Sequence, residues 1–327
     1  MGYKRLQNTV TESKALMPVA AAIAAAACYL TGLVEQELWM QLVCLAVSTI
    51  LLLELNSANQ LLRVNSQATA ATYLLLVATA IFLFPKIENS IMQLCIVALY
   101  YMLFHCKLHD ESPGWVFYGF FCLGLASMVF VQVLYYVPVI WVLMASCLRA
   151  FNAKTFWASI IGLATPYWLG GPFIIFFQGG DVVASHFRPL WEFLPLADFK
   201  GVGEHEWLAI GWTVTLTVIG VVHYLNSGYQ DKIRTRLLHE IFITVDIVTL
   251  IFLILQPQHY ELLLGIMIVN TSPLIAHYMT LTHTWLTNIT FQIIVIITLA
   301  IIAYNVWMPS SNFLSNTAIQ ACSFLPL

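Results

Sequence analysis

Residues 239–256 read HEIFITVDIVTLIFLILQ, and stretches of this kind decide the fold class of the chain. After Glu240 the stretch is apolar up to Leu255, except for two threonines and Asp246. A helix of about 20 apolar residues crosses the hydrocarbon core of a bilayer, which is about 30 Å thick. The stretch therefore predicts a membrane-spanning helix.

The whole chain has the composition of a membrane protein. Of its 327 residues 60% are hydrophobic and 9% are charged, whereas a soluble domain carries about 25% charged residues. The apolar residues form long runs, unlike the short alternating segments of a transmembrane β-barrel. We expect an all-α, polytopic transmembrane bundle of about eleven spans, a single membrane domain over residues 1–327 with no soluble domain. The expected spans are 15–33, 38–55, 68–85, 90–106, 115–130, 132–148, 155–177, 207–226, 239–256, 260–281 and 285–307.

One division within this pattern stays open. Residues 115–148 form a single apolar run that is too long for one helix and short for two full spans. Gln132 and Pro138 are consistent with two helices joined by a tight turn, or with a re-entrant pair. The first run, 15–33, follows basic residues as a signal peptide would, but it is long enough to span and is expected to remain as the first helix.

The basic residues predict the orientation, because lysine and arginine concentrate in cytoplasmic loops. With the N-terminus inside, ten of the 13 basic residues fall in cytoplasmic segments, and only Lys86, Arg188 and Lys200 fall outside. The expected topology is N-in and C-out. Residues 178–206 then form an external interfacial loop, with a short surface helix expected over 187–199.

Composition and motifs also exclude several classes of function. The net charge of −3 and the lack of a basic tract argue against nucleic-acid binding. The seven cysteines are scattered and form no CxxC pair, so they are expected to act as small apolar side chains. The sequence has no His/Cys cluster with metal-ligand spacing, no Walker loop and no GxGxxG motif. We expect no metal and no cofactor, and the lipid bilayer as the first partner.

Ionisable groups inside spans are costly, so each is a candidate functional residue. The first group lies at the end of the second span, where Glu54 is followed by Asn59 and Arg63, with Asn56 and Gln60 expected on the same helical face. An arginine here suits a phosphate or a carboxylate. The alternative is an ordinary helix end at the cytoplasmic interface.

The second and third groups surround prolines. Pro166 and Pro172, with Gly170 and Gly171 between them, are expected to kink or break the seventh span, either as a plain kink or as part of a transport path.

In the tenth span, Asn270 and Ser272 precede Pro273, and His277 follows. Either Asn270 and Ser272 satisfy the backbone groups that the proline frees, or the patch faces a cavity with His277 as a proton carrier. Asp246 of the neighbouring span is expected to approach this patch.

The fourth group is in the external loop, where His186 and Arg188 lie among carboxylates. An arginine at a membrane surface could hold a lipid-linked pyrophosphate. As part of an ordinary solvated loop, the same residues need no special role.

From about residue 69 to 176 the chain resembles an uncharacterised family of polytopic inner-membrane proteins of Bacteroidota. The resemblance rests on Gly119 with Gly124-Leu125-Ala126-Ser127, Pro138 with Trp141, Arg149-Ala150-Phe151-Asn152 with Phe156-Trp157, and Gly162-Leu163-Ala164-Thr165-Pro166-Tyr167. It implies a multi-pass protein of the bacterial inner membrane and no particular activity.

The same stretch is distantly similar to GT-C membrane glycosyltransferases, which take sugars from polyprenyl phosphates. That similarity implies Glu35 or Glu37 as the acid or base, with His186 and Arg188 near the phosphate. The first external loop is much shorter here than in those enzymes, which puts the assignment of the acid in doubt.

Three functions therefore remain open. The chain could be a membrane subunit that packs against other membrane proteins of an envelope assembly, which its 13% aromatic content fits. It could be a GT-C-like enzyme acting on a polyprenyl-linked saccharide, or a transporter or flippase in which Asp246 couples to protons.

Overall fold

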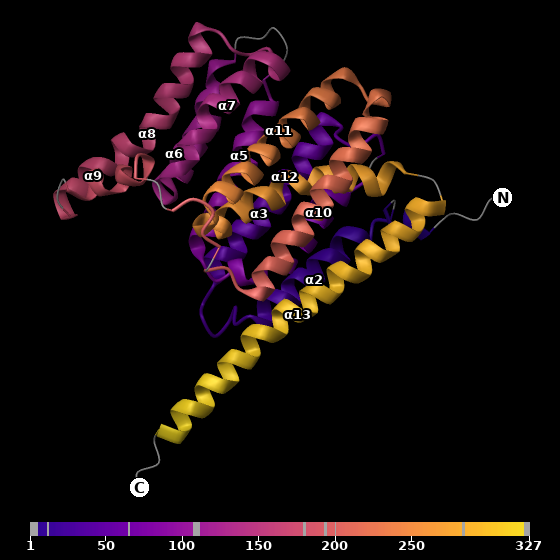
Figure 1. The fold of residues 1–327 in the computed structure, drawn as a ribbon. Helices are drawn as coiled ribbons and strands as arrows, with labels where there is room; N and C mark the ends of the chain where they lie inside the picture. Colours follow the sequence, from indigo (N-terminus) through magenta and orange to yellow (C-terminus); the bar gives the residue numbers. More distant parts are fainter. Residues whose placement is uncertain are drawn as a thin grey trace.

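A computed structural model describes residues 6–11, 13–64, 66–106, 112–178, 181–192, 195–199, 201–282 and 285–323. Throughout this part the protein is helical and contains no strand, so the all-α prediction is confirmed (Figure 1). The α-helices are α1 (Leu6–Thr11), α2 (Leu16–Leu30), α3 (Trp39–Asn59), α4 (Ala68–Thr79), α5 (Ile87–Phe104), α6 (Pro113–Val129), α7 (Tyr136–Leu143), α8 (Ala153–Gln178), α9 (Asp181–Phe187), α10 (Glu204–Ser227), α11 (Ile233–Leu255), α12 (Tyr260–Leu281) and α13 (Trp285–Ser323). Short 3-10 or π turns extend several of them: η1 (Ile81–Leu83), η2 (Val131–Tyr135), η3 (Met144–Leu148), η4 (Arg188–Leu190), η5 (Gly228–Gln230) and η6 (Pro257–His259).

The lengths and compositions of these helices support a multi-pass membrane protein. In the described residues, eight helical segments are long and apolar enough to cross a membrane, and α2, α4 and α6 are shorter apolar helices. Each coincides within a few residues with one of the expected spans. The eight segments are Trp39–Asn59, Ile87–Phe104, Val131–Leu148, Ala153–Phe177, Glu204–Gln230, Ile233–Leu255, Pro257–Leu281 and Trp285–Trp307.

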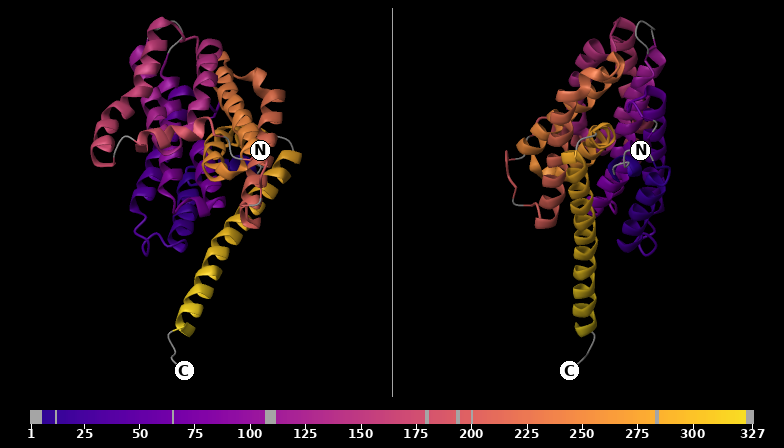
Figure 2. Two further views of the ribbon diagram at one scale, coloured as in Figure 1. Left: turned by 60° about the vertical axis from the view of Figure 1, so that its left-hand side comes forward. Right: turned by 90° about the vertical axis from the view of Figure 1, so that its right-hand side faces the viewer.

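Helix α12 lies at the centre of the bundle. It packs against α4, α5, α10 and α11, and 89% of its apolar, membrane-spanning stretch is buried inside the bundle. A helix surrounded by other helices can carry polar groups only where those neighbours satisfy them. The long α13, by contrast, lies along the outside of the bundle (Figure 2).

The run 115–148 forms two helical segments. The first, α6, ends at Val129, and Phe130 adopts an extended conformation before η2 begins at Val131. The second segment, Val131–Leu148, is itself long enough to span. Chain direction therefore changes at Phe130, as expected for two joined helices.

The prolines do not break the helices of the seventh and tenth spans. Helix α8 continues through Pro166 and Pro172, and α12 continues through Pro273. In α8 the ring of Pro166 lies against α6 at Gly124, where a side chain would leave no room for it. In α12 the hydroxyl of Ser272 donates to the carbonyl of Val269, the group that Pro273 deprives of its usual donor.

The segments that connect the helices lie at two ends of the bundle, and at each end hydrogen bonds and ion pairs join them to one another. One end joins α1, the loop after α3, the α10–α11 turn and the end of α12, through the pairs Gln7–Met279, Ser66–Thr11, Arg63–Asp231 and Lys232–Gln60. The other end joins the segments around residues 85, 132, 190 and 260, through the pairs Gln41–Pro85, Lys86–Glu261, Gln132–His259 and Tyr135–Leu190.

One smaller expectation needs correction. The surface helix of the loop 178–206 lies earlier than expected, at α9 (Asp181–Phe187), and Pro189 cannot continue this α-helix. Helix α13 extends beyond Trp307 to Ser323. Within the loop 178–206, residues 179–180, 193–194 and 200 lie outside the described residues.

Candidate functional site

A polar cavity of about 640 Å³ opens beside the end of α3 and the turn between α10 and α11. Helix α3 ends at Asn59, and Gln60 takes a left-handed conformation with φ of 50° that turns the chain away from the helix axis. The helical face expected to include Arg63 therefore ends before that residue. The loop nevertheless brings the same side chains to one cavity, whose lining comprises Asn56, Ser57, Gln60, Leu62, Arg63, Val64, Gln230, Asp231, Lys232 and Thr235.

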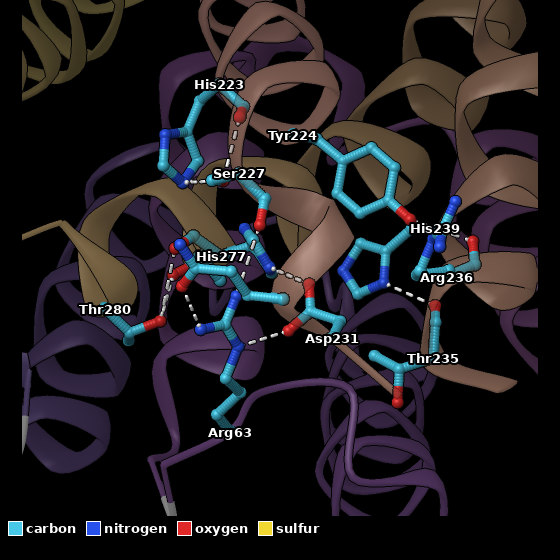
Figure 3. Close-up of polar contacts among 12 residues, drawn as sticks. Arg63, His223, Tyr224, Ser227, Asp231, Thr235, Arg236, His239, His277 and Thr280 are labelled. Carbon is cyan, nitrogen blue, oxygen red and sulfur yellow. Dashed lines mark hydrogen bonds and ion pairs between the residues drawn. The ribbon is translucent and has the colours of Figure 1, made fainter. Parts of the chain in front are cut away.

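An ion pair lies at the inner wall of this cavity. Arg63 Nε donates to Asp231 Oδ1, and His277 Nε2 lies 2.9 Å from Asp231 Oδ2 (Figure 3). The side chains of Asp231 and His277 are 1% and 0% exposed, while that of Arg63 is 35% exposed. Burial alone would raise the pKa of Asp231, but the hydrogen bonds from His277 and Arg63 outweigh it and lower the pKa to about 2. Asp231 is therefore ionised at neutral pH.

Basic side chains surround the entrance. The guanidinium group of Arg63 also donates to Gln230 Oε1 at 2.9 Å, so it contacts two neighbouring residues of the α10–α11 turn. Lys232 Nζ donates to the neutral Gln60 Oε1 at 2.6 Å, and no ion pair to Lys232 occurs among the residues that the structure describes. Asn59 accepts a hydrogen bond from Arg234, which places it beside the cavity.

Behind the ion pair, three imidazole rings and a phenol ring pack together. The ring of His277 lies 5.1 Å from that of His239 and 5.4 Å from that of His223, and Tyr224 stacks on His239. His239 Nδ1 lies 3.0 Å from the Thr235 carbonyl oxygen and therefore carries hydrogen. His239 Nε2 and His277 Nδ1 are buried without a hydrogen-bond partner. Both nitrogens are thus open to a proton or to a further donor.

Asp246 lies deeper in the bundle. It follows His239 by seven residues on α11, which is about two helical turns, so both face the same side. The hydroxyl of Thr271 donates to Asp246 Oδ2 at 3.2 Å, and Thr217 bonds Thr271 at 2.7 Å. Asp246 is 1% exposed, its Oδ1 has no partner, and no ion pair to it occurs among the described residues.

Asn270 faces the same polar core from α12. Tyr100 donates to its Oδ1 at 2.6 Å, while its Nδ2 has no partner. The sequence allowed Asn270 to satisfy the backbone near Pro273, but Ser272 does this instead. Asn270, Asp246 and His277 are therefore all buried where α11 and α12 pack together, and they form the polar region of this helix pair.

The remaining candidates lie elsewhere. Glu54 is exposed on α3, and Glu35 and Glu37 are exposed in the turn between α2 and α3. His186 Nε2 lies 3.1 Å from the Ser127 carbonyl oxygen, and exposed Arg188 pairs with Glu192 at 2.7 Å.

No described hydrogen bond or ion pair joins Glu35 or Glu37 to His186 or Arg188. An apolar groove of about 300 Å³ does adjoin His186, between α8 and α9.

Sequence reasoning missed Asp231, His223 and Tyr224. Asp231 is the single acid beside Lys232, Arg234 and Arg236. An acid inside a basic loop is a usable signal for an ion pair. Within the described ranges, no group of three or more His, Cys, Asp or Glu side chains could hold a metal ion.

Comparison of the chain with protein-family models, with curated proteins and with solved structures gives no match.

Proposed function

We propose that this chain is a membrane transporter that couples movement of a solute to protons, with Asp246 as the proton-binding group. The proposal rests on one observation: the carboxyl group of Asp246, on α11, is buried in the bundle, and one of its oxygens has no hydrogen-bond partner. Acids within spans are costly and mark proton relays and substrate pathways. A purely structural acid at this depth would be expected to pair with a cation, and none pairs with Asp246 in the described residues.

A series of titratable groups supports the coupling. Asp231, at the cavity wall, contacts His277, and the His277 ring contacts that of His239. His239 and Asp246 then share one face of α11. Protons entering from the cavity would meet these side chains in turn before they reach Asp246. A transport path between the proline segments of α8 and α12 has less support, because the main contacts of α8 are with α6 and α9.

The proposal includes a topology in which the eight long segments and the three shorter apolar helices all cross the membrane. The cavity would then face the cytoplasm, and the α9 segment the opposite side. The grouping of connecting segments at two ends supports this arrangement, because successive connections alternate between those ends.

The two other functions have less support. A GT-C-like enzyme would need Glu35 or Glu37 close to His186 and Arg188, and no described contact joins them. A membrane subunit of an envelope assembly would use exposed apolar faces, but lipid covers such faces equally well. Neither function gives a reason for an unpaired acid in the bundle core.

Proton uptake by reconstituted proteoliposomes tests the proposal. Proteoliposomes loaded with a pH-sensitive dye would receive inorganic phosphate, glycerol phosphate or succinate under an inward proton gradient. We expect solute-dependent internal acidification by the wild type for at least one probe. Asp246→Asn should reduce that acidification by about tenfold or more, because the amide cannot take up the proton.

Glu240→Gln is the matched control, since Glu240 is an exposed acid on the same helix. It should acidify the liposomes as the wild type does. The proposal fails if no probe produces acidification above that of empty liposomes, or if Asp246→Asn behaves as the wild type.

A further inference from the structure

The cavity at the end of α3 offers a combination of groups that suits a ligand. Arg63 and Lys232 supply positive charge, and in the described part of the chain Lys232 has only the neutral Gln60 amide as its hydrogen-bond partner. Asn56 lines the same cavity and is 8% exposed; its Nδ2 donates to the Ser66 carbonyl oxygen at 2.9 Å, while its Oδ1 has no partner. An unpartnered buried acceptor is costly unless another donor reaches it.

We infer that this cavity binds a small oxyanion that also carries a hydroxyl donor, and that its binding is linked to uptake of a proton by His277. Phosphate or carboxylate oxygens would contact Arg63 and Lys232, which suit both groups. The hydroxyl would donate to Asn56 Oδ1. Glycerol phosphate has this chemistry, whether as a free solute or as part of a lipid headgroup.

The charges at the cavity favour an anion. Arg63 and ionised Asp231, which line the cavity together with Lys232, compensate each other. Lys232 therefore leaves the cavity with a net charge of about +1, and a bound monoanion restores neutrality. The cavity volume of about 640 Å³ is large enough for a ligand of several heavy atoms with water.

The proton linkage follows from the shared partner. An anion on Arg63 competes with Asp231 for the guanidinium, so Asp231 then depends more on His277. Because ionised Asp231 can only accept, His277 Nε2 donates its hydrogen to it, and His277 Nδ1 is buried without a hydrogen-bond partner. A proton added at Nδ1 produces the imidazolium that compensates Asp231. By linkage, protonation of His277 in turn strengthens anion binding.

Other titratable groups also face His277. His223 and Tyr224 approach from α10, and His239 approaches from α11. A charge on His223 or His239 would repel the imidazolium, so a single proton is expected to be shared by the cluster. The inference rests on the proposed function only for the later transfer of this proton to Asp246, since anion binding and proton uptake are equilibrium properties.

Isothermal titration calorimetry of the purified full-length chain tests both parts. Inorganic phosphate and glycerol phosphate would each be titrated at pH 7 in two buffers with different ionisation enthalpies. We expect glycerol phosphate to bind more tightly than phosphate, with uptake of about one proton per anion. Lys232→Gln should weaken binding by about fivefold or more, and His277→Gln should abolish proton uptake.

Lys86→Gln is the matched control, because Lys86 is an exposed cation in an ion pair at the other end of the bundle. Its binding should equal that of the wild type. Lys232 is exposed, so its variant is expected to fold even where Arg63→Gln does not.

Nanodiscs with phosphatidylglycerol or phosphatidylcholine distinguish a lipid source from a free solute. Competition of phosphatidylglycerol with glycerol phosphate, lost in Lys232→Gln, assigns the site to a lipid headgroup. Binding of glycerol phosphate equal in both nanodiscs assigns it to a free solute.

The inference is overturned if neither probe binds, if Lys232→Gln binds as the wild type does, or if binding occurs without proton uptake. These outcomes are separate from those for transport. Binding without solute-driven acidification would remove the proposed function alone, and acidification with unchanged binding in Lys232→Gln would remove this inference alone.

Discussion

His277, one turn from the end of the most enclosed helix, contacts Asp231 of the α10–α11 turn at 2.9 Å, with both side chains almost fully buried. Because Arg63 pairs with the other oxygen of Asp231, this carboxylate connects α12, the α10–α11 turn and the loop after α3. The same contact holds the turn in place and sets the charge at the cavity wall.

Asp231→Asn should therefore destabilise the protein. Removing one partner of a buried pair typically costs about 3–5 kcal/mol, and partly exposed Arg63 places the expected loss near the lower value. Thermal unfolding in mild detergent would measure it. Glu192→Gln, which removes the partner of exposed Arg188, should change the stability by less than about 1 kcal/mol. Equal effects of the two substitutions would contradict the role given to Asp231.

The same carboxylate predicts how stability depends on acid. The pKa of Asp231 in the folded protein is about 2, below its ordinary value of 3.8. A lowered pKa stabilises the fold above about pH 4, and this contribution disappears as the pH falls from about 4 to about 2. Unfolding midpoints of the wild type should decrease over this interval more steeply than those of Asp231→Asn. Parallel curves for the two proteins would exclude this contribution.

The contact between α6 and α8 depends on small residues. A Cβ atom at Gly124 would lie 2.7 Å from the Leu163 carbonyl oxygen, which cannot move without shifting α8. Gly124→Ala should cost about 1–3 kcal/mol, as overpacking usually does. At Gly171 a Cβ would meet nothing within 4 Å, so Gly171→Ala should be neutral or slightly stabilising. Thermal unfolding of both variants provides the comparison, and a harmless Gly124→Ala would contradict the close packing.

The proposed topology predicts opposite accessibility for two exposed positions. A cysteine replacing Glu37 should react with a membrane-impermeant maleimide in intact cells, whereas one replacing Ser57 at the cavity should react only in inverted vesicles. The native cysteines within the described spans should stay unlabelled, because burial and lipid shield them from water-borne reagents. Labelling of Ser57→Cys in intact cells would reverse the orientation.

Much of this fold could be predicted from the sequence because membrane spans depend on local properties. Run length and hydropathy predict the bounds of α12 to the residue, since a helix must satisfy its backbone within the bilayer. Helix α11 begins at Ile233, six residues before its expected start, because its first turns are polar. Pro166 and Pro273 do not break their helices, for a tertiary reason. Gly124 makes room for the first proline ring, and Ser272 satisfies the carbonyl freed by the second.

The polar region was only half predictable. Asp246, Asn270 and His277 could be identified because each is costly inside an apolar run. Their connection to Arg63 could not, because Asp231 lies 168 residues from Arg63 and 46 from His277 along the chain. A single sequence contains no record of such long-range pairing, and Asp231 resembles any other acid in a loop.

The depth of Asp246 has an electrical consequence. In a membrane, moving one elementary charge across the full potential changes its energy by about 2.3 kcal/mol per 100 mV. Asp246 lies near the middle of α11, so a proton that reaches it crosses about half of that field. Its occupancy should therefore respond to voltage by about 1 kcal/mol per 100 mV. Because its protons arrive from the cytoplasmic cavity, a polarised cell with a negative interior would load this carboxyl group less readily than a depolarised one.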